Sequence, residues 1–139
     1  MAISNLRSPH DKVGPIVYFG RMLDKIRLHG AGELPADYIP NLGDGFDKFC
    51  VQLLGVNYMD LVRRVKEGGT DEKILAWCQS EGRTLSDQDF LVWNEFMRKR
   101  GWNDTASERL TQRKAETGFA DRDDIQTFFD YIDADEGRR

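Results

Sequence analysis

The chain has 139 residues, 40% of them hydrophobic, which is enough for one folding unit with a core of its own. Its net charge at pH 7 is −4, but residues 121–136 hold seven acidic residues against one basic residue. The remaining chain is close to neutral and lacks the basic patch of nucleic-acid binding, so we expect no nucleic-acid partner. Without an apolar run of about 18 residues or a leader, the chain is expected to be cytoplasmic, with no membrane association.

Glycine ends most of the apolar-periodic segments, and a residue that can cap a helix precedes most of them. This pattern predicts an all-α fold, a compact single-domain bundle of about seven short helices, with no strand. Ser86 and Asp89 are spaced as a capping box, which marks the start of one helix. The predicted helices are 15–30, 44–54, 58–69, 71–82, 87–101, 104–118 and 121–134.

We expect residues 1–139 to form one domain, with an N-terminal extension over 1–14 and an acidic C-terminal helix and tail over 121–139. The one long connection is 31–42, in which Pro35 and Pro40 oppose a helix. Connections of this length are often functional. This one is either a lid held to the core by its apolar residues or a binding element.

The first predicted helix is apolar on more than one side, so we place it at the centre of the bundle. At 100° per residue, Tyr18, Arg21 and Lys25 fall along one border, with His29 one turn further on. This edge could hold a carboxylate or phosphate, since it offers several hydrogen-bond donors. Alternatively, both basic side chains lie over the edge of the core and pair with the acidic C-terminal segment, while His29 only complements the helix dipole.

Aromatic residues suggest a second part of the same ligand site. Trp93 on the fifth predicted helix, Asn94 beside it and Trp102 just after its end could line a pocket together with Tyr38 of the long connection. Packing in the core is the competing explanation for aromatic residues at helical spacing.

The remaining chemistry-bearing residues support no metal site and no cofactor. The chain has two histidines and two cysteines, all far apart in sequence, with no CxxC or HxxxH spacing. Cys50 and Cys78 lie in apolar segments and are expected to be reduced and buried. No phosphate-binding loop, dinucleotide fingerprint or nucleophile motif is present.

Five strings together resemble a bacterial family known as a domain of unknown function: "LRSPHDKVGPIVYFGRMLDKIRLHG", "YIPNLGDGFD", "GTDEKILAWC", "WNEFMRKRGWND" and "DDIQTFFDYIDADEGR". The resemblance covers Leu6 to Arg138 and implies a stand-alone bacterial protein of this size. It implies no reaction and assigns no catalytic residue.

Two functions therefore remain open. The first is a non-enzymatic binding or interaction protein, with a small anionic ligand or a protein as its partner. The second is a small enzyme that acts on an anionic metabolite held by Arg21 and Lys25, with His29 or Tyr18 as the general acid or base.

Overall fold

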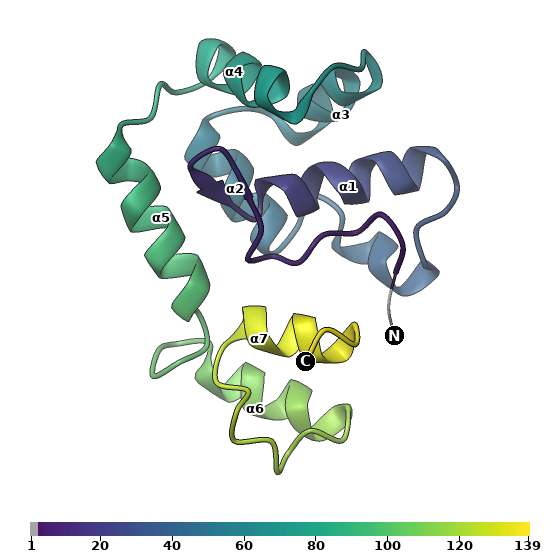
Figure 1. Ribbon diagram of the computed structural model, residues 1–139, viewed down its shortest axis with the longest axis vertical. Coiled ribbons are helices and arrows are strands. Elements are labelled where there is room, and N and C mark those ends of the chain that lie inside the picture. The colour runs from purple at the N-terminus through teal and green to yellow at the C-terminus, as the bar shows by residue number, and fades with distance from the viewer. Residues whose placement is uncertain (1–2) are drawn as a thin grey trace.

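The computed structural model describes residues 3–139, which form seven α-helices, one 3-10 helix and one short hairpin (Figure 1). The all-α prediction is confirmed, because the two strands have only two residues each. No helix in the described part is long and apolar enough to cross a membrane. The elements are β1 (Lys12–Val13), β2 (Ile16–Val17), α1 (Phe19–Gly30), η1 (Ala36–Asn41, the 3-10 helix), α2 (Phe46–Leu54), α3 (Tyr58–Lys66), α4 (Asp71–Glu81), α5 (Asp87–Lys99), α6 (Ser107–Glu116) and α7 (Phe128–Asp135).

The start of the first helix was predicted wrongly. Residues 12–17 form an antiparallel hairpin in which Val13 faces Ile16 across a turn at Gly14, whose φ is +54°. Positive φ suits glycine in a tight turn. Pro15 therefore belongs to the turn and not to the first helical turn, and α1 begins at Phe19.

The start of the last helix was also predicted wrongly. Residues 121–127 form turns and irregular structure, and α7 begins only at Phe128, where the Thr127 side chain accepts a hydrogen bond from the Asp130 amide.

Three predicted caps are confirmed: Asn57 and Thr70 cap α3 and α4, and Ser86 and Asp89 form the full capping box of α5. The helix predicted from residue 104 begins only at Ser107, and its N-cap residue Ala106 makes no side-chain cap hydrogen bond, so the cap predicted at Asn103 or Asp104 was wrong.

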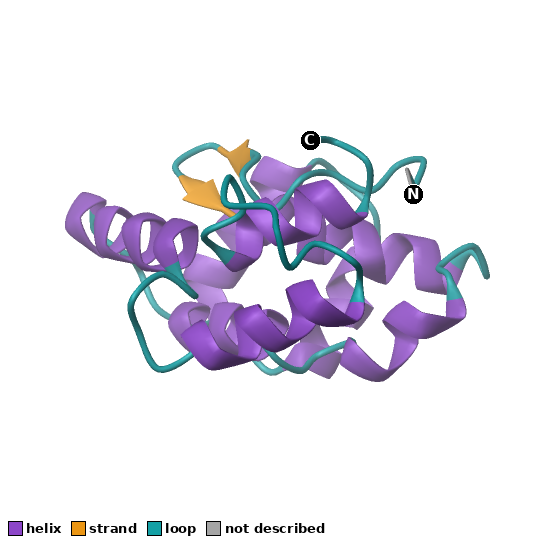
Figure 2. Ribbon diagram, turned by 90° about the horizontal axis from the view of Figure 1, so that it is seen from below, coloured by secondary structure: helices purple, strands orange, loops and turns teal. Residues whose placement is uncertain are grey.

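Helix α1 lies in the middle of the molecule, with α3 and α4 on one side and α6 and α7 on the other (Figure 1). Figure 2 shows the small hairpin as the sheet structure of the described residues among the helices. Nine of the twelve residues of α1 are buried, among them Phe19, Met22 and Leu23, which are completely inaccessible. The predicted central position of this helix is thus observed. Cys50 and Cys78 are free and buried in the same core, and burial raises the pKa of the Cys78 thiol to about 12.

The connection 31–42 contains a buried leucine and a 3-10 helix. Leu34 is buried against Leu6 and Leu28 in a small cluster of its own, and the following residues wind into η1, which includes Pro40. Ile39 stays exposed. The connection is thereby held to α1 at its start, while η1 borders the cavity described next.

Candidate functional site

A cavity of about 480 Å³ lies between α1, η1, the start of α2, and helices α6 and α7. Four of the eight predicted ligand-binding residues line it: Tyr18, Arg21, Lys25 and Tyr38. It is rich in aromatic and charged side chains. The other lining residues are Asp37, Asn41, Asp44, Gly45, Phe46, Phe49, Arg100, Ala106, Arg109, Arg113, Phe128, Tyr131, Ile132, Asp135 and Glu136.

Lys25, Tyr18 and Asp47 form a buried polar group beside the cavity. Lys25 Nζ lies 2.9 Å from Asp47 Oδ1 and donates a hydrogen bond to the Tyr18 hydroxyl at 3.1 Å. The hydroxyl in turn donates to Asp47 Oδ1 at 2.6 Å. Asp47 is fully inaccessible, and its other oxygen accepts from the Gly43 amide at 3.0 Å. Every polar group of the three residues therefore has a partner, as burial requires.

The pKa values follow from this arrangement. Burial, followed by the charge of Asp47, raises the pKa of Tyr18 well above its ordinary value, so the phenol stays protonated at neutral pH. Burial lowers the pKa of Lys25, and the charge and hydrogen bond of Asp47 offset only part of this effect. Tyr18 can thus donate a hydrogen bond but is a poor general base.

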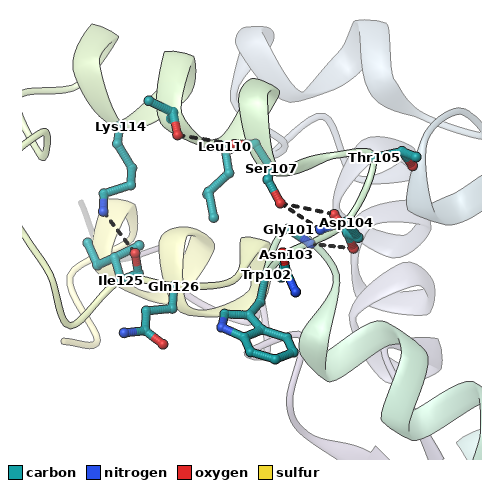
Figure 3. Close-up of a pocket in the computed structure, with 11 residues that line it drawn as sticks. Gly101, Trp102, Asn103, Asp104, Thr105, Ser107, Leu110, Lys114, Ile125 and Gln126 are labelled. Carbon is teal, nitrogen blue, oxygen red and sulfur yellow. Dashed lines mark hydrogen bonds between the residues drawn. The ribbon is translucent and has the colours of Figure 1, made fainter.

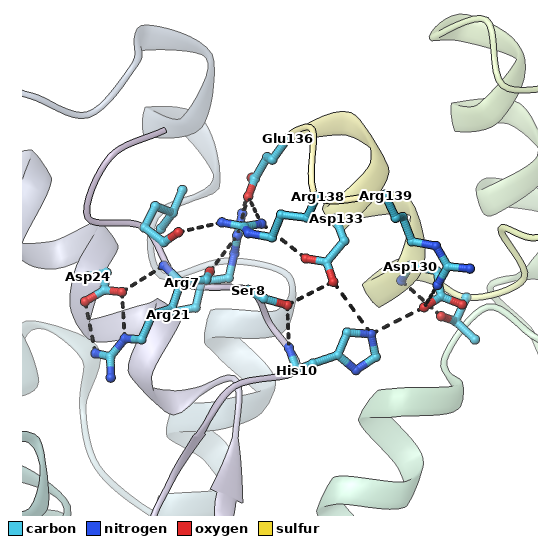
Figure 4. A network of polar contacts seen from close by, with 12 residues as sticks. Arg7, Ser8, His10, Arg21, Asp24, Asp130, Asp133, Glu136, Arg138 and Arg139 are labelled. Carbon is cyan, nitrogen blue, oxygen red and sulfur yellow. Dashed lines mark hydrogen bonds and ion pairs between the residues drawn. The ribbon is translucent and has the colours of Figure 1, made fainter. Parts of the chain in front are cut away.

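Arg21 forms the second buried group, with Glu136 at the end of α7. The two side chains make a bidentate pair, with distances of 2.8 and 2.6 Å from the guanidinium to the carboxylate (Figure 4). The Tyr38 hydroxyl donates to the same carboxylate at 2.7 Å, and Arg138 contacts it at 2.6 Å. Burial alone would raise the pKa of Glu136, but Arg21 and the other donors outweigh it and lower the pKa to about 2.

Figure 4 shows that this pair belongs to a network that joins the first residues of the chain to α7. The Ser8 hydroxyl donates to Asp133 at 3.0 Å, and His10 Nε2 lies 3.3 Å from Asp130. Arg21 also donates to the Arg7 carbonyl. The N-terminal segment is therefore packed onto the acidic helix, and Glu136 just after this helix is the counter-charge of Arg21 in the body of the protein.

The alternative of charge pairing at the core edge is thus observed for Arg21, whose partner Glu136 belongs to the acidic segment. Lys25 is paired as well, but with Asp47 of α2 and not with that segment. Neither cation is left without a counter-charge. An incoming anion would have to compete with Glu136 or Asp47 for them.

Trp93 and Asn94 hold the backbone that presents Tyr18. Trp93 Nε1 donates to the Val17 carbonyl at 3.1 Å, and Asn94 accepts from the Val17 amide and donates to the Pro15 carbonyl. Tyr18 has a φ of +73°, which is unfavourable for a bulky residue and needs such support. The two α5 residues therefore act on the cavity through Tyr18, and neither lines it.

The other two predicted residues lie elsewhere. His29 is exposed at the C-terminal end of α1, outside the cavity. Trp102 is exposed beside a wider hollow of about 740 Å³ between the α5–α6 loop and α6 (Figure 3). In that hollow, Lys114 donates to two backbone carbonyls and Asp104 caps the loop. These polar groups organise the chain's own loops.

Sequence reasoning missed the arginines on the opposite wall of the cavity. Arg109 and Arg113 project from α6, and Arg100 follows α5. Arg100 lies 3.4 Å from Asp104, whereas Arg109 and Arg113 form no ion pair with any side chain of the described residues. The i, i+4 spacing of Arg109 and Arg113 was the available signal, because it puts both on one face of a helix.

Comparison with curated proteins and with solved structures finds no match to this chain. The family model described as "Domain of unknown function (DUF5069)" matches residues 3–138, nearly the whole chain, and the protein belongs to this family.

Proposed function

We propose that the protein is a non-enzymatic binding protein whose ligand is a small anion, a carboxylate or a phosphate ester with an apolar or aromatic part. The ligand lies in the cavity between η1 and α6, with its charged group toward Arg109 and Arg113 and its apolar part against the aromatic side chains.

One observation carries the proposal: two exposed arginines on one face of α6 line a cavity whose two buried cations, Arg21 and Lys25, are already neutralised. Guanidinium groups bind carboxylate and phosphate oxygens through paired hydrogen bonds, which are stronger than neutral ones. Arg109 and Arg113 have no counter-ion among the described residues, so a ligand would complete their pairing without first breaking one.

The rest of the cavity supports a ligand with an apolar part. Phe46, Phe49, Phe128 and Tyr131 all line it. The volume, about 480 Å³, is within the range of small-molecule sites. Tyr38 is held by Glu136 and Tyr18 by Asp47, so both aromatic rings are fixed before a ligand arrives, which lowers the entropy cost of binding.

The enzymatic alternative has less support from the same geometry. It required His29 or Tyr18 as the acid or base, and His29 lies outside the cavity. The raised pKa of Tyr18 keeps its proton in place. Nor does Lys25 have an unpaired amine, since Asp47 holds it.

As a further part of the proposal, we assign the protein to the bacterial cytoplasm, as one domain over residues 1–139. Support comes from its two free cysteines, which suit a reducing compartment, and from the resemblance to a bacterial family.

The test is an NMR titration of the isotope-labelled protein with phenyl phosphate, benzoate and inorganic phosphate. Saturable shifts are expected at amides of η1, α6 and α7, with phenyl phosphate or benzoate binding more tightly than inorganic phosphate. Arg109→Ala/Arg113→Ala should weaken binding at least about tenfold, given about 1.5 kcal/mol or more per charge-assisted hydrogen bond.

The matched control is Arg63→Ala, which removes an exposed arginine on α3 whose one ion pair within residues 3–139 is with Asp60. It should leave the affinity unchanged. Shifts spread over all basic side chains, no shifts at millimolar ligand, or equal losses in both variants would disprove the cavity as an anion site.

A further inference from the structure

The cavity that holds the proposed anion site also carries negative charges without counter-ions. Asp37 of η1 and Asp44, which precedes α2, both line it. Each is exposed, and neither side chain forms an ion pair or hydrogen bond with any residue that the structure describes. The cavity therefore presents two unpaired carboxylates in addition to the two unpaired guanidinium groups of Arg109 and Arg113.

These opposite charges line one cavity but do not meet. Within residues 3–139, no ion pair joins Asp37 or Asp44 to either of the two arginines. The cavity thus has a cationic side on α6 and an anionic side on η1 and the start of α2. A ligand that bridges the two sides would supply the partner that each side lacks.

The other cations of the cavity do not change this balance, because each already has a carboxylate. The pairs are Arg21 with Glu136, Lys25 with Asp47, and Arg100 with Asp104. A ligand with negative charge alone is attracted by α6 but repelled by the carboxylates of the other side. A ligand with a negative and a positive group at separate ends is attracted by both sides.

The backbone of the anionic side is fixed in place. Asp44 follows Gly43, whose φ of +74° suits glycine and whose amide is held by Asp47 at 3.0 Å. Asp37 is next to Tyr38, whose hydroxyl is hydrogen-bonded to the carboxylate after α7 at 2.7 Å. Both carboxylates are therefore carried by ordered chain, which lowers the entropy cost of binding a cationic group between them.

We propose that the ligand of this cavity is a zwitterion, in which an amine is joined to a carboxylate or phosphate through an apolar or aromatic part. Its acidic group lies toward Arg109 and Arg113, and its ammonium group lies toward Asp37 and Asp44. The apolar part lies between them, against the aromatic side chains of the cavity. This inference rests on the proposed function and narrows the ligand class of the same site.

The test compares three probes with the same ring in NMR titrations of the labelled protein. The first, 4-(aminomethyl)benzoate, has both charges, 4-methylbenzoate lacks the ammonium group, and 4-methylbenzylamine lacks the carboxylate. The zwitterionic probe should bind roughly fivefold more tightly than either of the others, as expected when two exposed ion pairs are added.

Two variants locate the ammonium group. Asp37→Asn/Asp44→Asn should weaken the binding of 4-(aminomethyl)benzoate by roughly fivefold, while the affinity for 4-methylbenzoate stays the same or rises. The matched control, Glu67→Gln/Glu72→Gln, removes two negative charges at exposed positions outside the cavity and should leave both affinities unchanged. The amide spectrum of each variant shows whether it still folds.

The outcomes separate this inference from the proposed function. Equal affinities for 4-(aminomethyl)benzoate and 4-methylbenzoate, both weakened by Arg109→Ala/Arg113→Ala, would overturn the zwitterion and leave the anion site in place. Equal losses in the aspartate and glutamate variants would overturn it too, because a change in net charge would then explain them. If neither acid binds, or if binding does not depend on the two arginines, the proposed function fails and this inference fails with it.

Discussion

Arg21 and Lys25 on α1 line the same cavity as Arg109 and Arg113 on α6, but the two pairs differ in their surroundings. The α1 pair is buried, and each member has a carboxylate within 2.9 Å. The α6 pair is exposed and forms no ion pair among the described residues. Moving a charge out of water costs several kcal/mol unless a counter-charge accompanies it. Burial therefore dictates pairing, and only the exposed cations remain available to a ligand.

The largest loss of stability that this comparison predicts is for substitution of Asp47. Asp47→Ala leaves Lys25 buried without its counter-charge, so the free energy of unfolding should fall by roughly 3–5 kcal/mol. Urea denaturation measures it. Asp47→Ala/Lys25→Met should lose less than the single variant, and Asp44→Ala, at an exposed position on the same cavity, should change little. A loss below about 1 kcal/mol for Asp47→Ala would contradict the claim that the buried cations, unlike the exposed ones, need a counter-charge.

The second prediction concerns the stability of the fold at low pH. The pKa of Glu136 is lowered from 4.5 to about 2, so this residue stabilises the fold above pH 4.5, and the contribution is lost as the pH falls toward 2. The contribution is roughly 3 kcal/mol. The stability difference between the native chain and Glu136→Gln should therefore shrink over this window, as measured by denaturation at successive pH values. Glu81→Gln, an exposed control, should show no such trend; a constant difference for Glu136→Gln would refute the assignment.

A smaller loss of stability is expected for substitution of Asn94, which does not line the cavity but holds the backbone next to Tyr18. Asn94→Ala removes the acceptor of the Val17 amide and the donor to the Pro15 carbonyl, with a loss of about 1–3 kcal/mol. Hydrogen exchange at Val17 should become faster, and the resonances of Tyr18 should move. The exposed Gln112→Ala is the control. Unchanged exchange at Val17 would mean that Asn94 does not hold this strand.

The smallest effect on stability is expected on the α6 wall. Arg109→Ala and Arg113→Ala should each change the free energy of unfolding by no more than about 0.5 kcal/mol, as is usual for exposed positions. Arg21→Ala, measured by the same thermal and urea unfolding, should cost several times more because it leaves Glu136 buried without its main partner. Similar losses of stability for the α6 arginines and for Arg21 would contradict the difference between the exposed and the buried pair.

Much of the fold was predictable because helix caps are local. Asn57, Thr70 and Ser86 each bond amides within three residues of themselves, so the sequence pattern carries the information. The hairpin at 12–17 was not predictable in this way. Its second strand is held by Trp93 and Asn94, which are 76 and 77 residues away, and a glycine and proline pair alone also suits the start of a helix.

The sequence predicted the residues on the α1 side of the cavity but not those on the α6 side. The helical period placed Tyr18, Arg21 and Lys25 on a common border, and all three line the cavity. The sequence offered pairing with the acidic C-terminal segment as an alternative, which is correct for Arg21. It could not show that Lys25 pairs with Asp47 of α2, because that contact depends on tertiary packing. The same limit applied to Arg109 and Arg113, whose spacing is visible in the sequence but whose position opposite α1 depends on tertiary packing.

The contacts between the first residues and α7 also bear on how the protein is made. Ser8 and Arg21 find their partners 125 and 115 residues later in the chain. During synthesis, Arg21 must therefore stay hydrated after α1 has left the ribosome, because a buried guanidinium without Glu136 is too costly. Contacts of such separation also close slowly. The neighbourhood of α1 can thus close only after α7 has been synthesised and has left the ribosome.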